Sequence, residues 1–245
     1  MYQLHPHQPV IIYSQSNLSS TNLAARVDAV AEALFKAGCV PGNHVAVLCE
    51  PSADIIVAML AVLKTGCVYV TLDTSLPNAR HAAMVHMCGP VLLLFHAATE
   101  KNVFKLSVES TATLQQMSLT AIADSGLGAK DEPPLRLDDA DAPAVLLFTS
   151  GSTGKPKGVV LTQGNFTNHL ALKTHLLSLG RERVLQHSPL GFGMSIIKVF
   201  CALANGGARV AAPRNMRRDL VALTDLVVEH RVSLILATPS EYFAW

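Results

Sequence analysis

The sequence predicts an α/β fold, built from layered and largely parallel sheets that are flanked by helices. Two observations lead to this prediction. Short apolar runs of strand length alternate along the chain with segments whose apolar residues recur at helical spacing. Some of the short runs, such as Val91–Phe95 and Ala144–Phe148, are apolar at every position. Strands that are buried on both faces have this composition, and right-handed crossovers through helices cover parallel strands in that way.

The first half of the chain opens with a predicted strand at Val10–Tyr13 and a long amphipathic helix. Ser20 or Thr21 is suited to cap this helix, and Gly38 ends it. Its apolar stripe has spacings of four, three and four residues and consists of Leu23, Val27, Val30 and Leu34. The elements expected next are a strand at Val45–Cys49, a helix at Ala53–Lys64, a strand at Val68–Leu72, a helix at Asn78–Met87 and a strand at Val91–Phe95.

The second half repeats the alternation after a segment rich in Gly, Pro and Asp, residues 124–143, which is typical of a surface linker. The expected elements are strands at Ala144–Phe148 and Val159–Leu161, a helix from Thr162 to about Leu177, a strand at Val184–His187, a helix at Met194–Leu203, a strand at Val210–Ala212, a helix at Leu220–His230, a strand at Val232–Ala237 and a helix that begins at Pro239-Ser240. We therefore expect a tail at 1–9, a first α/β part at 10–123, the linker, and a second α/β part at 144–245. Because the last helix has little more than one turn, we expect the chain to be truncated there.

Composition excludes several classes of protein. Basic and acidic residues number 19 and 18, so no basic excess indicates a nucleic-acid partner. The longest apolar run, Ile55–Leu63, is too short to cross a bilayer, and the polar start Met1–Pro9 is not a secretory signal. Five scattered cysteines predict buried thiols. The ten histidines lack the spacing of metal ligands. His187 is interpreted as a core residue that donates to the backbone. We expect a soluble, cytoplasmic protein with neither a membrane partner nor a metal bound by its own side chains.

The decapeptide Thr149–Gly158 carries the strongest functional signal. It reads Thr-Ser-Gly-Ser-Thr-Gly-Lys-Pro-Lys-Gly and lies between two predicted strands. Glycines allow backbone N–H groups to point inward, and hydroxyl groups and lysines add donors and charge, which suits phosphate oxygens. The pattern differs from a Walker A loop, because Thr149 and Pro156 stand where that motif requires Gly and Ser or Thr. A surface turn without function is the alternative interpretation.

This decapeptide resembles the phosphate-binding signature of the adenylate-forming (AMP-binding) superfamily, which includes acyl-CoA synthetases, luciferases and the adenylation domains of nonribosomal peptide synthetases. Leu63–Asp73 is similar to a second family segment, although Thr71 replaces its proline, and Ser19–Val47 resembles the opening helix and strand. Ala202–Gly207 and Ala237–Tyr242 look most similar to adenylation domains of hybrid polyketide–peptide synthetases. The resemblance implies a truncated form of the large N-terminal domain of that fold, and it covers nearly the whole chain.

The resemblance assigns roles to the decapeptide. The hydroxyl groups and amides that would hold the β- and γ-phosphates of ATP belong to Thr149, Ser150, Gly151, Ser152, Thr153 and Gly154. Lys157 would act as the catalytic cation that neutralises the departing pyrophosphate, whereas Lys155 would face solvent. Mg²⁺ would bridge the phosphates, as expected for a hard cation that prefers oxygen ligands. Outside this motif Lys157 would be interpreted as a solvated surface lysine.

The segment Leu190–Ser195 is similar to the family's substrate segment Phe-Ser-Phe-Asp-x-Ser. The family's aspartate pairs with the ammonium group of an amino-acid substrate, and Gly193 replaces it here. By the same resemblance Met194, Ile197 and Leu236 would line an apolar substrate pocket. The alternative is that these three side chains belong to the ordinary core.

The family's reaction has two steps, namely attack of a carboxylate on the α-phosphorus of ATP and transfer of the acyl group to a thiol. The resemblance therefore implies that ATP activates a carboxylic or amino acid for a phosphopantetheine thiol on a carrier-protein domain outside this chain. An acyl- or aryl-CoA ligase fragment and a non-catalytic remnant or interaction module are the alternatives. The family's adenine and ribose segments and its small C-terminal domain would follow Trp245, so we expect the isolated chain to be inactive.

Overall fold

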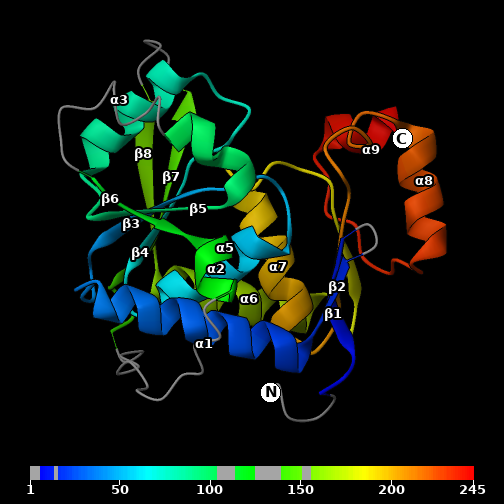
Figure 1. Cartoon of the computed structure of the whole chain (residues 1–245). Coiled ribbons are helices and arrows are strands. Elements are labelled where there is room, and N and C mark those ends of the chain that lie inside the picture. Colours follow the sequence, from blue (N-terminus) through cyan, green and yellow to red (C-terminus); the bar gives the residue numbers. More distant parts are fainter. Residues whose placement is uncertain (1–5, 14–15, 104–113, 125–138, 151–155) are drawn as a thin grey trace. The chain divides into compact units, whose positions relative to one another are not determined.

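The computed structural model describes residues 6–13, 16–103, 114–124, 139–150 and 156–245 (Figure 1). The chain forms two compact units, and neither unit is a sequential half of the chain. We call Ala25–Phe166 the hairpin unit and the combination of Met1–Ala24 with Thr167–Trp245 the terminal unit. This division differs from the sequential segments expected from the linker composition.

The hairpin unit contains a six-stranded sheet with the strand order β6-β5-β3-β4-β7-β8. Its strands are β3 (His44–Leu48), β4 (Val68–Thr71), β5 (Leu92–Phe95), β6 (Gln115–Ser118), β7 (Pro143–Ser150) and β8 (Pro156–Thr162). All neighbouring strands are parallel except β7 and β8, which form an antiparallel pair. The predicted parallel sheet is thus confirmed, with one antiparallel strand at its edge.

Helices cover both faces of this sheet. They are most of α1 (Ser20–Lys36), α2 (Ala53–Lys64), α3 (Asn78–Cys88) and the short α5 (Leu119–Asp124), together with the 3₁₀ turn η1 (Ala97–Thr99). Figure 1 shows α3 on the side of the sheet opposite to α1 and α2. Met84 and Val85 of α3 pack against strand residues such as Leu48 and Leu93 in one buried cluster. The four apolar residues of the predicted α1 stripe are all buried, which confirms the helical spacing.

The terminal unit contains a four-stranded sheet with the order β2-β1-β10-β9. Its strands are β1 (Pro9–Tyr13), β2 (Ser16–Ser19), β9 (Arg183–Gln186) and β10 (Ala208–Ala211), and its helices are most of α6 (Gln163–Leu176), α7 (Gly193–Ala204), α8 (Leu220–Glu229) and α9 (Pro239–Ala244). The strands β1, β10 and β9 are parallel, and β2 is antiparallel to β1. Leu223 and Leu226 of α8 pack on this sheet against Leu185 and Val210.

The expected strand at Val232–Ala237 is wrong in its extent. Only an isolated parallel bridge between Val184 and Leu234 forms there, in which the amide of Leu185 donates to the carbonyl of Leu234 at 3.0 Å. An apolar run alone does not make a strand, because each backbone group also needs a paired neighbour. The strands β2 and β6 were not expected, because their sequences SNLS and QQMS lack an apolar pattern.

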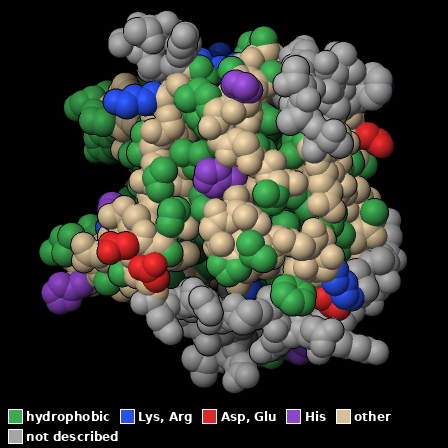
Figure 2. All heavy atoms as spheres, turned by 90° about the vertical axis from the view of Figure 1, so that its left-hand side faces the viewer, with side chains coloured by type: hydrophobic (Ala, Val, Ile, Leu, Met, Phe, Trp, Pro, Cys, Tyr) green, Lys and Arg blue, Asp and Glu red, His purple; other side chains and the backbone are tan. Residues whose placement is uncertain are grey.

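The remaining expected features have mixed outcomes. The cysteines are free thiols, all buried except the half-buried Cys88. Most of the expected linker 124–143 lies outside the described residues. Among the residues that the structure describes, no helix is both long and apolar enough to cross a membrane. On the face shown in Figure 2, charged side chains are few, and they lie scattered among hydrophobic and polar ones.

Candidate active site

The hairpin of β7 and β8 presents the ends of the predicted phosphate loop. Its register pairs Phe148 with Gly158, Thr149 with Lys157 and Ser150 with Pro156. The last two pairs lie at the end of the hairpin where the loop begins and ends. The predicted site residues Gly151, Ser152, Thr153 and Gly154 lie outside the described residues, as does Lys155, and Ser150 is described only in its backbone. Their roles therefore stay predictions.

Thr149 and Lys157 lie opposite each other in the hairpin. Both residues are exposed, and the Thr149 hydroxyl donates to the Lys157 carbonyl at 3.4 Å. Within the described residues, the Lys157 ammonium has no carboxylate in ion-pair range. An exposed cation without a partner beside a hydroxyl group suits an anionic ligand such as a phosphate.

Arg80 is a candidate that sequence reasoning missed. It lies in the first turn of α3, and its Nη2 donates to the carbonyl of Thr149 at 3.4 Å, across 69 residues of chain. The buried Nε of Arg80 makes no hydrogen bond to any described residue. A guanidinium group therefore lies beside the start of the predicted loop. No local spacing marks this position, because only the fold brings α3 to the end of β7.

The predicted substrate residues lie in the terminal unit. Gly193 begins α7, and the half-buried Met194 and Ile197 follow in its first turns, three residues apart on one side of the helix. Leu236 is also half-buried and lies two residues beyond the bridge between Leu234 and β9. The structure thus places three of the four residues on one helix, and a separate segment carries the fourth.

Lys198 is a second residue that sequence reasoning missed. It lies on α7 and is completely buried, and its Nζ donates to the Ser188 hydroxyl at 3.0 Å. Burial lowers the pKa of Lys198 to about 8, the Glu241 carboxylate opposes this shift, and Arg217 adds to it. A buried lysine with a lowered pKa near a predicted substrate segment is a candidate functional group.

His187 interacts electrostatically with Lys198 and contacts residues at the C-terminal end of the chain, in and beside α9. Its Nε2 lies 3.5 Å from Oε1 of Glu241, and its ring meets the Trp245 indole edge-on at a centroid distance of 6.1 Å. Burial and the charge of Lys198 lower the pKa of His187, against the effect of Glu241. His187 is a core residue as expected, but the expected donation to the backbone is wrong. Neither ring nitrogen has a hydrogen-bond partner among the described residues.

Glu241 is held in place by the start of α9. The amide and the hydroxyl of Thr238 donate to its Oε2 at 2.8 and 3.0 Å, and the Glu241 amide donates back to the Thr238 hydroxyl. Burial raises the pKa of Glu241, but the two bonds from Thr238 and the charges of His187 and Lys198 together outweigh this effect, so the pKa is lowered. Glu241 is therefore an ionised carboxylate that caps the start of α9.

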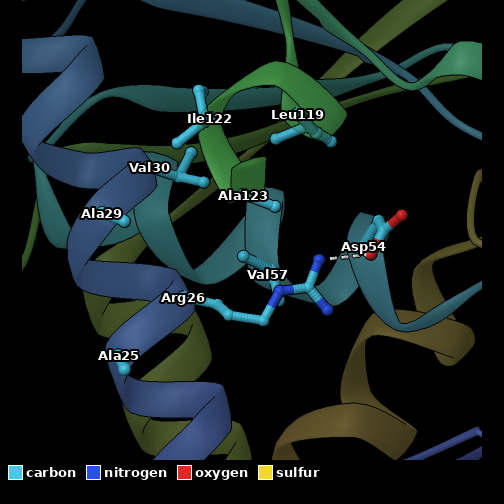
Figure 3. A pocket seen from close by; sticks show the side chains of 9 residues that line it. All are labelled: Ala25, Arg26, Ala29, Val30, Asp54, Val57, Leu119, Ile122 and Ala123. Carbon is cyan, nitrogen blue, oxygen red and sulfur yellow. Dashed lines mark hydrogen bonds and ion pairs between the residues drawn. The ribbon is translucent and has the colours of Figure 1, made fainter. Parts of the chain in front are cut away.

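The hairpin unit also contains an apolar cleft of about 290 Å³ between α1, α2 and α5 (Figure 3). An ion pair between Arg26 and Asp54, 2.5 Å long, crosses its edge, and the other lining residues are Ala25, Ala29, Val30, Val57, Leu119, Ile122 and Ala123. None of the predicted site residues that the structure describes lines this cleft. Among the described residues, no group of three or more His, Cys, Asp or Glu side chains could hold a metal ion.

Similarity to known proteins assigns the chain to a family. The sequence profile of the family described as "AMP-binding enzyme" matches residues 2–243. The chain is 56% identical over 245 residues, its full length, to the hybrid PKS-NRPS synthetase iliA of Neonectria sp. (strain DH2), and it spans only 6% of that protein.

Solved structures support the same assignment. One is the N-terminal subdomain of Klebsiella oxytoca NpsA in complex with 3-hydroxybenzoyl-AMSN. It is 25% identical to this chain with a TM-score of 0.81, and the match covers 96% of this chain and 57% of that chain. An artificially fused adenylation-PCP di-domain, NpsA-ThdA from the same organism, is 26% identical with a TM-score of 0.82, covering 96% of this chain and 45% of that chain. Because the family profile spans almost every residue, the chain belongs to the AMP-binding enzyme family.

Proposed function

We propose that this chain is the N-terminal part of an adenylation domain that uses ATP to convert a carboxylic or amino acid to an acyl-adenylate. The observation that carries the proposal is the hairpin end, where Thr149 and Lys157 pair across the strands and Arg80 reaches the same point from α3. Two cations and a hydroxyl group beside a loop rich in glycine and hydroxyl side chains suit a triphosphate. Family membership supports the same conclusion.

In this proposal the chain contributes positioning and charge neutralisation. The substrate carboxylate attacks the α-phosphorus of ATP, and pyrophosphate leaves with the bonding electrons. Adenylyl transfer of this kind needs little covalent help from the protein. Lys157 and Arg80 would stabilise the negative charge that builds up on the leaving group. Mg²⁺ would bind to the phosphate oxygens and supply further charge neutralisation.

The acceptor of the acyl group is proposed to be a phosphopantetheine thiol on a carrier domain. The relative iliA is named a hybrid synthetase of which this chain spans 6%, and the NpsA-ThdA structure joins an adenylation domain to a PCP. A second candidate is an acyl- or aryl-CoA ligase, which Gly193 favours because no carboxylate at that position meets an α-ammonium group. Thioester formation with coenzyme A in place of a carrier protein would identify the second candidate.

Binding of MgATP and pyrophosphate to the chain, measured by calorimetry, tests the proposal directly. We expect weak binding that Lys157→Ala reduces while the folded state is unchanged by circular dichroism. Exchange of labelled pyrophosphate into ATP, in the polypeptide that carries the complete domain, tests the reaction. A folded chain that binds neither ligand would instead favour a non-catalytic remnant.

A further inference from the structure

Two of the five cysteines lie side by side in the hairpin unit. Cys39 follows the end of α1 by three residues, and Cys67 directly precedes β4. Both residues are buried free thiols, and their side chains are hydrogen-bonded to each other. Neither residue belongs to the hairpin end or to the predicted substrate segment. The proposed adenylation reaction therefore makes no use of this pair.

Backbone contacts hold the two cysteine-bearing segments together. The amide of Gly42 donates to the carbonyl of Gly66 at 2.9 Å. The Cys67 thiol donates to the carbonyl of Val40, with 3.3 Å between sulfur and oxygen. Val40 is the residue that follows Cys39 in the chain. The turn that contains Cys39 is therefore fixed against the start of β4, and the closeness of the two thiols follows from the folded backbone.

The thiol pair lies beneath a surface turn. Cys39 is 4% exposed, but its neighbours in the turn are all exposed, namely Gly38, Val40, Pro41 and Gly42. The carbonyl that contacts Cys67 belongs to the same turn. The sulfurs are therefore covered by one layer of residues on this side. Local opening of a surface turn costs much less than global unfolding, and it would admit a molecule as small as hydrogen peroxide.

The two thiols differ in acidity from each other and from the remaining cysteines. Hydrogen bonds with Cys39 and Thr65 lower the pKa of Cys67 and together outweigh the opposite effect of burial. The hydrogen bond with Cys67 raises the pKa of Cys39, and burial adds to this effect. Burial also raises the pKa of the other three cysteines, Cys49, Cys88 and Cys201. Because the thiolate is the reactive form, Cys67 is the thiol best suited to attack an oxidant.

We propose that Cys39 and Cys67 form an oxidation site, in which hydrogen peroxide converts the paired thiols into a disulfide within the hairpin unit. The Cys67 thiolate attacks one peroxide oxygen, the O–O bond breaks, and hydroxide leaves and becomes water with the proton that Cys67 has lost. The Cys39 sulfur then attacks the sulfenic acid on Cys67, so that an S–S bond replaces the S–O bond. The Cys39 proton leaves with the hydroxide as a second water. The two sulfurs together lose two electrons, which the peroxide gains.

The disulfide would close a loop of the chain that contains β3 and α2. A cross-link of this kind removes conformational freedom from the unfolded chain and thereby stabilises the folded one. We expect the melting temperature of the oxidised chain to rise by about 5–10 °C. Because exchange with a thiol opens disulfides, dithiothreitol should return the chain to the melting temperature of the reduced form.

Peptide mapping of the 245-residue chain after treatment with hydrogen peroxide at neutral pH tests the proposal. The remaining free thiols are alkylated in denaturant, and trypsin digestion follows without reductant. Cys39 lies in the tryptic peptide 37–64 and Cys67 in the peptide 65–80, so the disulfide should link these two peptides. We expect the link to form at least severalfold faster than peroxide oxidises Cys88 or Cys201. Peptide 37–64 also contains Cys49, and Cys49→Ala is the matched control that should keep the link.

Single variants separate the roles of the two thiols. In Cys39→Ala no link can form, and we expect Cys67 to accumulate as a sulfenic acid that dimedone traps. In Cys67→Ala we expect Cys39 to stay a free thiol that is alkylated in denaturant. Both variants should lose the rise in melting temperature that peroxide causes in the wild type. Melts of the reduced proteins establish that each variant is folded before the comparison is made.

Three results would overturn the proposal. One is a wild type in which both thiols stay free while peroxide oxidises the half-buried Cys88. Another is a link that forms in denaturant and not in the folded chain. The third is a linked chain that melts at a lower temperature than the reduced one, because the bond would then form only by distorting the fold. Each of these results would leave the adenylation proposal standing, since that proposal is tested by pyrophosphate binding and exchange.

Discussion

At the scale of single residues, the two cations beside the hairpin end have different origins. Lys157 belongs to a local motif, and it is exposed and paired with Thr149 in the hairpin. Arg80 lies 69 residues before Thr149 and contacts it only because α3 packs near β7 and β8. A motif within ten residues can be recognised in the sequence, whereas a contact between residues so far apart along the chain is a property of the fold.

Removing either cation should weaken phosphate binding. We expect Arg80→Met and Lys157→Ala each to reduce pyrophosphate affinity by about 1–3 kcal/mol, which is typical of lost charge-assisted hydrogen bonds. Calorimetry at two salt concentrations should also show a weaker salt dependence in both variants. The matched control is Arg218→Met, an exposed arginine of the terminal unit. An affinity for pyrophosphate that Arg80→Met leaves unchanged would show that Arg80 only anchors the end of β7.

Lys198 should lower stability at neutral pH. Its pKa falls from 10.5 to about 8 on folding, so the unfolded chain binds the proton more tightly than the folded one. The penalty is present below pH 8, decreases as the pH rises from about 8 to 10.5, and is absent above that range. At pH 7 we expect Lys198→Met to be more stable by roughly 1–3 kcal/mol.

Denaturant unfolding of the wild type and Lys198→Met between pH 6.5 and 10.5 measures this difference. The gap between the two proteins should close as the pH rises, because a neutral lysine no longer has a desolvated charge. Taking the difference cancels the ionisation of the cysteines, which are common to both proteins. A gap that is constant with pH would indicate that packing and not charge causes the effect.

At the scale of elements, helix ends and strand starts depend on close backbone contacts. Gly207 lies between α7 and β10, where a Cβ atom would come within 2.1 Å of the carbonyl oxygen of Glu182 and 2.8 Å of its amide nitrogen. The amide of Ala208 donates to the same carbonyl at 2.9 Å. The close approach of β10 to the chain before β9 therefore requires a glycine at this position.

Gly207→Ala should destabilise the terminal unit by about 1–3 kcal/mol or more, because backbone atoms and not a flexible side chain must move. Gly180→Ala is the matched control, since the nearest atom to its Cβ would be the Glu182 carboxylate oxygen at 3.9 Å. Thermal melts followed by circular dichroism compare the two variants. Similar melting temperatures for both would contradict the predicted clash.

At the scale of the whole molecule, large apolar side chains of the terminal unit are exposed. Tyr242 and Phe243 of α9 are 73% and 84% exposed, and Val221 and Val228 of α8 are 72% and 71% exposed. Exposed apolar groups of this size favour association between molecules. We therefore expect the 245-residue chain to self-associate at micromolar concentration.

Size-exclusion chromatography with light scattering tests this expectation. The double variant Tyr242→Glu with Phe243→Glu should shift the chain toward the monomer, because charged side chains oppose burial at a contact. Replacing Lys101, an exposed residue of the hairpin unit, with Glu provides a control for added negative charge. A wild type that stays monomeric at high concentration and melts cooperatively would contradict the prediction.

The sequence by itself determined the class of the fold, the family and most of the elements. Helical spacing identified α1, uninterrupted apolar runs identified β5 and β7, and a ten-residue motif identified the hairpin end, since each of these signals is local. It also showed that Gly193 replaces a charged residue of the family. Local signals failed where pairing decides the outcome, as with the polar strands β2 and β6 and the bridge at Leu234.

Only the tertiary structure decided which distant residues meet. The two units are not sequential halves, because β7 and β8 extend the sheet of β3, β4 and β5 while β9 and β10 join the N-terminal strand β1. The same folding brings Arg80 to the hairpin end and surrounds Lys198 with Ser188, His187 and Glu241. Burial gives Lys198 its unusual electrostatics, and burial is a property of packing that no spacing of residues along the chain can specify.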